Sequence, residues 1–152
     1  MLQIDKTSIV QAIAPATNAS QLTGDYISLK NVVKCTIVVF GIWTTTDTSA
    51  ITIEQSTAVA NTGHTAITQV VPIHVNLDCD ADDTLAAATA AVSYTTNADA
   101  ETKIVVFEVT PDLLDAGYDV INVIVGASSG SNIVSALYIL DLRYSAADVI
   151  TD

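Results

Sequence analysis

Basic residues are the scarcest group in this sequence, and their scarcity excludes several functions. The 152 residues include 5 Lys and Arg against 17 Asp and Glu, a formal net charge of −12. Binding to DNA or RNA needs clustered Lys and Arg that contact phosphates, so we expect no nucleic-acid partner. The same deficit argues against an anionic membrane surface as a partner.

Charge of either sign is also in short supply. Charged residues make up 14% of the chain, whereas an average soluble domain has roughly 25%. A surface with so little charge suits a protein that packs against neighbouring subunits. A soluble monomer with a threonine-rich coat is the alternative that the composition leaves open.

Long apolar runs are absent as well. The longest run, residues 35–43, is interrupted by Thr36 and is shorter than the roughly 18 residues that a membrane-spanning helix needs. Residues 1–6 have no basic segment followed by an apolar stretch, so we expect no signal peptide and synthesis in a cytoplasm. We expect residues 1–152 to form one domain, with 1–8 as an N-terminal arm and 145–152 as a C-terminal tail.

Cysteine is rare, which limits disulfide and zinc chemistry. The sequence has only Cys35 and Cys79, with no CxxC or Cys/His ligand spacing. Without a secretory signal we expect no disulfide. A structural zinc site is not expected either, and nothing in the sequence points to a cofactor.

Catalytic signatures are missing too. His64 lies in a predicted turn and His74 in the middle of a predicted strand, and neither belongs to a GxSxG or HExxH motif. Residues 126–130 are rich in Gly and Ser but lack the Lys of a phosphate-binding loop. We therefore predict that the protein is not an enzyme.

An acidic loop at residues 78–83 holds the best candidates for a metal site. Asp78, Asp80 and Asp82 alternate along it, and carboxylate oxygens are the ligands that Ca²⁺ prefers. An EF-hand is excluded, because Asp83 stands where that loop requires Gly. We predict a solvated acidic loop, with a looser calcium site as the alternative.

The dominant pattern is an alternation of period two, which is typical of β-strands. It predicts an all-β protein, an antiparallel β-sandwich of eight or nine strands with one short helix, and jelly-roll connectivity is one candidate arrangement. The helix is predicted at 110–117, and segment 85–91 is ambiguous between a helical turn and a loop. The predicted strands are residues 8–14, 26–29, 32–43, 50–60, 66–77, 92–95, 103–109, 118–125 and 132–144.

Two predicted strands, 32–43 and 118–125, are apolar on both faces. Only one face of a strand in a sandwich contacts the core, so the second needs another cover, for which a subunit interface is the natural candidate. In the first strand, Val33 is expected to share a face with Cys35, Ile37, Val39 and Trp43. The residues expected to anchor an interface are Trp43, Phe40, Tyr138 and Tyr144.

Several segments in order along the chain resemble one group of known proteins. They are Gly24–Asn31 (GDYISLKN), Ile51–Ser56 (ITIEQS), Asn61–Gly63 (NTG), Asp119–Val123 (DVINV) and Ala136–Tyr144 (ALYILDLRY). Over residues 8–144 the chain is similar to small virion proteins of tailed bacteriophages, in particular head decoration (cement) proteins. The resemblance implies a structural β-sandwich on the capsid surface, often trimeric, which reinforces contacts between copies of the major capsid protein.

Two alternatives to this function stay open. The protein could belong to the neck, tail or a fibre of the same kind of particle. It could instead be a small sandwich that binds a glycan or calcium through the acidic loop.

Overall fold

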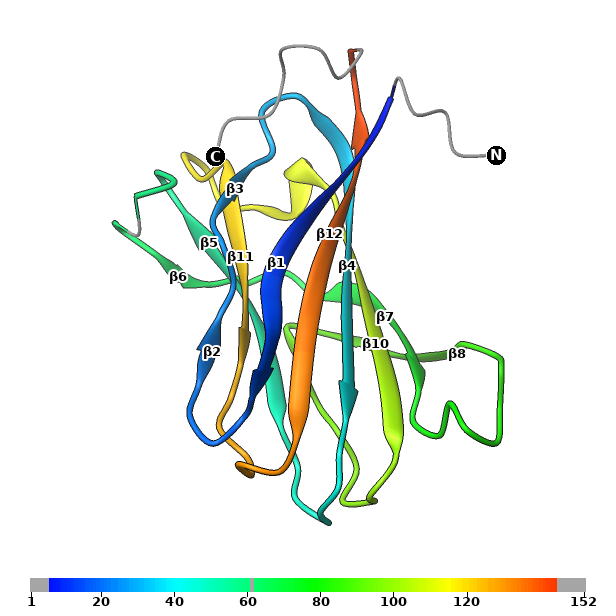
Figure 1. Cartoon of the computed structure of the whole chain (residues 1–152). Coiled ribbons are helices and arrows are strands. Elements are labelled where there is room, and N and C mark those ends of the chain that lie inside the picture. Colours follow the sequence, from blue (N-terminus) through cyan, green and yellow to red (C-terminus); the bar gives the residue numbers. More distant parts are fainter. Residues whose placement is uncertain (1–5, 61, 145–152) are drawn as a thin grey trace.

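The computed structural model describes residues 6–60 and 62–144, and it confirms an all-β sandwich (Figure 1). Sheet A contains, in order, β1 (Thr7–Thr17), β12 (Ile133–Leu142), β4 (Val32–Ile42), β10 (Thr102–Val109), β7 (Val71–Asn76) and β8 (Ala86–Ala91). Sheet B has the order β2 (Leu22–Thr23), β11 (Val120–Val125), β5 (Ala50–Ser56) and β6 (Thr65–Ala66); β3 (Ile27–Ser28) also pairs with β11, and β9 (Ser93–Thr95) with β5.

The strand pairs are nested in the sequence. β1 pairs with β12, β2 and β3 pair with β11, β4 pairs with β10, and β5 pairs with β9, all antiparallel. Successive pairs alternate between sheet A and sheet B. A long ribbon of nested antiparallel pairs rolled into two sheets has jelly-roll connectivity, so the chain has the jelly-roll arrangement, with β7 and β8 added beyond β10.

The core lies between the sheets and is built by the alternating residues of each strand. In β4, the side chains of Cys35, Ile37 and Val39 point inward and are buried. The prediction that Val33 shares this face is wrong, since Val32 is 2% exposed and Val33 is 51% exposed. The register between β4 and β12 shifts at this point, and such an irregularity reverses the alternation.

Two further segments differ from the sequence prediction. Residues 66–77 do not form one strand: β6 ends at Ala66 and β7 begins at Val71. Pro72 lies in a strand between β10 and β8, at a register shift opposite β8, so it occupies a bulge and not an edge. Segment 85–91, ambiguous in the sequence, is mostly the strand β8.

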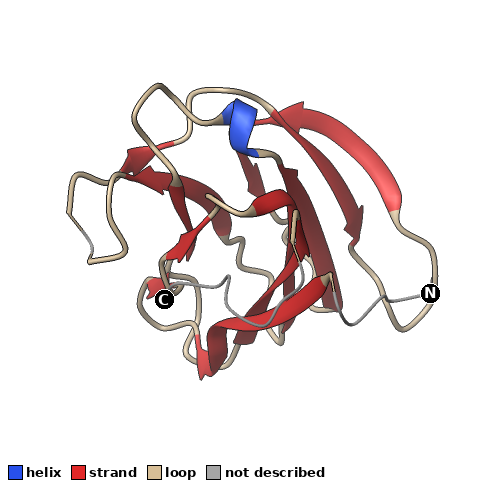
Figure 2. Ribbon diagram, turned by 90° about the horizontal axis from the view of Figure 1, so that it is seen from above, coloured by secondary structure: helices blue, strands red, loops and turns tan. Residues whose placement is uncertain are grey.

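The predicted helix is shorter than expected. Only Pro111–Leu113 form a helical turn, a 3₁₀ helix, which is visible from above in Figure 2. Among residues 6–60 and 62–144, no helix has the length and apolar character to cross a membrane. The predicted tail, and the first five residues of the predicted arm, lie outside the described residues; Thr7 and Ser8 belong to β1.

Candidate interaction surface

The outer face of sheet A is apolar and open to solvent. Five large side chains on it are between 42% and 58% exposed: Ile9, Phe40, Ile42, Ile133 and Leu137. They come from β1, β4 and β12, which lie side by side in Figure 1. An exposed apolar area that spans several strands marks a site of protein contact more often than scattered single residues do.

The strand register makes this area continuous. Leu137 of β12 pairs with Val38 of β4, which pairs with Val106 of β10. One step further down, Phe40 pairs with Ile104. We call the following nine side chains the apolar face: Ile9, Val38, Phe40, Ile42, Ile104, Val106, Ile133, Leu137 and Ile139.

Among the described residues, the charged side chains near the apolar face lie at its upper and lower borders. Asp141 pairs with Lys34 in the strand register, and the Lys34 Nζ lies 3.3 Å from the Glu108 Oε1. Both partners of this ion pair are more than a third exposed, so it adds less than about 1 kcal/mol to stability. The apolar face is therefore neutral over its whole centre.

The structure divides the four predicted interface residues. Phe40 lies on the apolar face, and Tyr144 is exposed just beyond the end of β12. Trp43 and Tyr138 are instead buried in the core, which corrects the expectation that they contact a partner. Both continue the inward alternation of their strands, and each has a polar partner inside the protein.

Tyr138 joins the two sheets. Its hydroxyl accepts a hydrogen bond from the backbone N–H of Val123 in β11 (3.0 Å) and donates one to the carbonyl of Asp25 (2.9 Å). Burial raises the pKa of Tyr138 well above its usual value. Gly24 passes so close that an added Cβ would lie 3.0 Å from this hydroxyl and 2.8 Å from the Val123 carbonyl oxygen.

Trp43 belongs to a polar network that closes the lower end of the sandwich. Its Nε1 donates to the Ser49 Oγ (3.3 Å), which also accepts from the Asn18 Nδ2 (2.9 Å). The buried Lys103 places its Nζ 5.2 Å from the centre of the Trp43 ring and donates to the carbonyl of Asn97 (2.8 Å). Burial lowers the pKa of Lys103. The sequence offered no signal for this network, because it joins loops that lie far apart in the chain.

A second network closes the upper end. The Gln55 Nε2 donates to one carboxylate oxygen of Asp115 (2.6 Å), and the Thr68 Oγ1 donates to the other (2.7 Å). The Gln55 Oε1 accepts from the backbone N–H of Asp115 (2.8 Å). The hydrogen bonds from Thr68 and Gln55 lower the pKa of Asp115.

The acidic loop uses its carboxylates to bind its own backbone and nearby hydroxyls. Asp82 accepts hydrogen bonds from the hydroxyl and the N–H of Thr84, which lower its pKa. Asp78 accepts from Ala81 N–H (3.1 Å), and Asp80 accepts a long hydrogen bond (3.5 Å) from the Thr102 hydroxyl. No group of three or more acidic, His or Cys side chains within the described residues is arranged to hold a metal ion.

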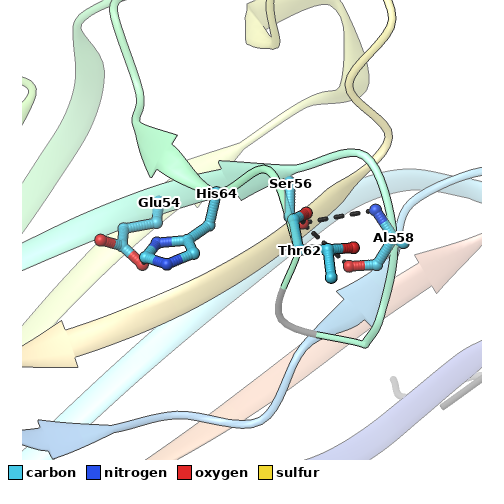
Figure 3. A network of polar contacts seen from close by, with 5 residues as sticks. All are labelled: Glu54, Ser56, Ala58, Thr62 and His64. Atoms are coloured by element: carbon cyan, nitrogen blue, oxygen red, sulfur yellow. Dashed lines mark hydrogen bonds and ion pairs between the residues drawn. The ribbon is translucent and has the colours of Figure 1, made fainter.

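On the outer face of sheet B, the chain itself buries Val120 and Asn122 of β11, while Thr65 and Ala66 of β6 are exposed. The single hydroxyl hydrogen of Ser56 is shared between the carbonyl oxygens of Ala58 and Thr62, each 2.8 Å from the Ser56 Oγ, and this fixes the turn after β5 (Figure 3). His64 follows, with its Nδ1 3.1 Å from the Glu54 Oε2, and its ring packs edge-on against Tyr26.

A small pocket lies next to the turn after β5. It has a volume of about 250 Å³, and its lining includes Val120, Thr57, Val59 and the ion pair of Lys30 with Asp119. This ion pair measures 3.0 Å and is exposed to solvent, so it adds little stability. The lining of the pocket also includes Ser28, whose hydroxyl accepts a hydrogen bond from the backbone N–H of Lys30 (3.4 Å).

The remaining candidates fit structural roles. Cys35 and Cys79 are both free thiols. Cys35 lies in the core, where burial raises its pKa, so it behaves as a small apolar residue. His74 lies in β7 opposite Val106, at the side of the apolar face.

Comparisons with known proteins give information on the fold. No protein-family model and no curated protein matches the chain. Among solved structures, it is similar to the SPBc2 prophage-derived protein YomS, with a TM-score of 0.51 and 13% identity over 88% of this chain and 91% of YomS. A structure described as CBM4 aligns with 91% of this chain and 70% of its own at 15% identity, but its TM-score of 0.41 is too low to support an argument. The chain thus shares its sandwich fold with a protein of prophage origin.

Proposed function

We propose that this chain is a structural protein of a tailed-bacteriophage virion, which decorates the capsid surface and stabilises contacts between copies of the major capsid protein. In this role it acts without catalysis, metal or cofactor. A second contact, between copies of the chain itself, forms a trimer.

The observation that carries this proposal is the apolar face. It is the outer surface of a long sheet, neutral at its centre and exposed, and a surface of this kind is stable in water chiefly when a partner covers it. The similar fold of a prophage-derived protein supports a phage origin. A glycan or calcium module has less support, because the acidic carboxylates bind the loop itself.

Mass spectrometry of purified particles tests the proposal. Particles assembled from the genome that encodes this chain are expected to contain it at a copy number close to that of the capsid protein or a simple fraction of it. Cryo-electron microscopy should place it on the outside of the head. Density at the neck or tail would favour the other virion location, and absence from the particles would refute the proposal.

The trimer is tested separately in solution. Sedimentation equilibrium of the purified chain is expected to give three times the 15.9 kDa mass of one chain. A monomer at all concentrations would remove the trimer from the proposal without affecting the capsid contact.

A further inference from the structure

Lys103 is a nucleophilic side chain held inside the protein. It lies on β10 and is fully buried, which is rare for a lysine. The ring of Trp43 covers one side of it, with its centre 5.2 Å from the Nζ. Burial lowers the pKa of Lys103, and the charges of Asp99 and Glu101 offset this effect only in part. More of the side chain is therefore the neutral amine than in an exposed lysine, and the neutral amine is the nucleophilic form.

A side-chain amide stands beside this amine. The Lys103 Nζ donates a hydrogen bond to the backbone carbonyl oxygen of Asn97 (2.8 Å), and covalent geometry keeps the Cγ of a residue within about 5 Å of its own carbonyl oxygen. The flexible stem of the lysine lets the Nζ turn from one carbonyl group of Asn97 to the other. The Asn97 Oδ1 is buried and has no hydrogen-bond partner among the described residues. Such an unpaired buried atom is uncommon in a native protein, and a reactive role is one explanation for it.

A carboxylate holds the other side of the amide. The Asn97 Nδ2 donates a hydrogen bond to the Asp99 Oδ2, and the charge of the same carboxylate acts on Lys103. Asp99 is thus close to both the amine nitrogen and the amide nitrogen. It can accept a proton from the first and donate it to the second, which is the work of a general base and a general acid. Lys30 and Lys34, in contrast, form ion pairs with carboxylates at the protein surface.

We propose that Lys103 and Asn97 form an isopeptide bond within the folded chain, with Asp99 as the proton carrier. The neutral Lys103 Nζ attacks the Asn97 Cγ, and the new C–N bond gives a tetrahedral intermediate. Asp99 takes a proton from the attacking nitrogen and passes it to the Asn97 Nδ2. The bond between Cγ and Nδ2 then breaks, and its electron pair leaves with ammonia. One amide replaces another, so the reaction needs no oxidant, reductant or cofactor.

The bond would fix the loop before β10 to that strand, at the lower end of the sandwich where Trp43 is buried. It forms once in each chain and converts no external substrate. The inference goes beyond the proposed function and does not depend on it.

Intact-mass spectrometry of the purified wild type tests the bond directly. The chain is expected to be lighter than its sequence by the mass of one ammonia molecule, and its digest should contain a peptide in which residues 97 and 103 are linked and trypsin has not cut after residue 103. The full sequence mass after long incubation of the folded protein at neutral and mildly alkaline pH overturns the inference. Loss of ammonia with an unmodified Lys103 also overturns it, because Asn97 has then cyclised onto the backbone.

Two lysine variants test which amine reacts. Lys103→Arg is expected to keep the full sequence mass, whereas Lys30→Arg, the matched control at an exposed position, is expected to lose ammonia like the wild type. Circular dichroism checks that both variants are folded, and the wild-type mass decides the question even if Lys103→Arg does not fold. Loss of ammonia from folded Lys103→Arg overturns the inference.

The rate of bond formation tests the role of Asp99. Asp99→Asn keeps the size of an exposed side chain but removes the proton carrier, so the linked fraction is expected to grow at least about a hundredfold more slowly after refolding. Asp47→Asn, exposed on the loop after β4, is the matched control and should link at the wild-type rate. Equal rates in these two variants overturn the assignment of Asp99 as the proton carrier.

Discussion

Sheets A and B each contain a central strand that is largely apolar on both sides, yet the outer sides of these strands have different surroundings. In sheet A, the outer side of β4 exposes Phe40 and Ile42 to solvent. In sheet B, the outer side of β11 carries Val120 and Asn122, which are buried. Thr57, Ala58 and Val59 of the turn after β5 line the same pocket as Val120.

This difference corrects part of the sequence interpretation. An apolar outer side predicts that a strand needs a cover, but it does not say which molecule supplies it. For β11 the chain supplies its own cover, through the turn after β5 and the Tyr26–His64 contact. Only β4 and its neighbours are left for a partner, so the argument for an interface applies to sheet A alone.

An aspartate placed on each outer face should give the largest change in unfolding free energy, and the change should differ most between the two sheets. Val120→Asp puts a carboxylate into a buried position beside Asp119 and is expected to cost about 3–5 kcal/mol of unfolding free energy. Leu137→Asp, on the exposed apolar face, should cost less than about 1 kcal/mol. Urea denaturation of the purified chain measures both. Equal losses would mean that the two faces are covered to the same degree in the isolated chain.

Much of the fold could be predicted because alternation of period two is a local property of the sequence. It located the long strands, and it placed Trp43 on the same side as Ile37 and Val39, which are core residues. The reversal at Val33 could not be predicted, because a register shift depends on the partner strand β12. The shortened helix is a similar case, since Thr110 and Pro111 favour a helical start without determining its length.

The candidate site was predicted less well, for a physical reason. Large aromatic residues serve equally as core and as interface anchors, so their type alone assigned Tyr138 to an interface when it lies in the core. The apolar face depends on cross-strand neighbours such as Leu137, Val38 and Val106. These residues are adjacent only after the strands pair, which a single sequence does not reveal.

Removing the Tyr138 hydroxyl tests whether this core residue holds the Tyr26–His64 contact of sheet B in place. Tyr138→Phe leaves the Val123 N–H and the Asp25 carbonyl without this partner, and a buried group left unpaired costs about 1–3 kcal/mol. Since Asp25 precedes Tyr26, the proton resonances of the His64 ring should also shift. Tyr144→Phe, at an exposed position, is the control and should change neither. Wild-type stability in Tyr138→Phe would show that the hydroxyl does not hold the sheets together.

The smallest expected effect is the loss, at low pH, of the stability that Asp115 contributes to sheet B. Asp115 binds Gln55 of β5 and Thr68, two residues after β6, so it links the two arms of the β5–β6 hairpin of sheet B. Its pKa is lowered in the folded protein, so its contribution to stability is complete above the ordinary carboxyl value of 3.8 and is lost as the pH falls through the lower folded value. Asp115→Asn should therefore be less stable than the wild type at neutral pH.

The difference in stability between the wild type and Asp115→Asn should narrow as the pH is lowered below the ordinary carboxyl pKa. Thermal unfolding between about pH 2 and about pH 7 measures it, with Asp112→Asn, an exposed neighbour in the 3₁₀ helix, as the matched control. A gap that stays constant down to the acid limit would mean that the Asp115 charge does not hold the hairpin.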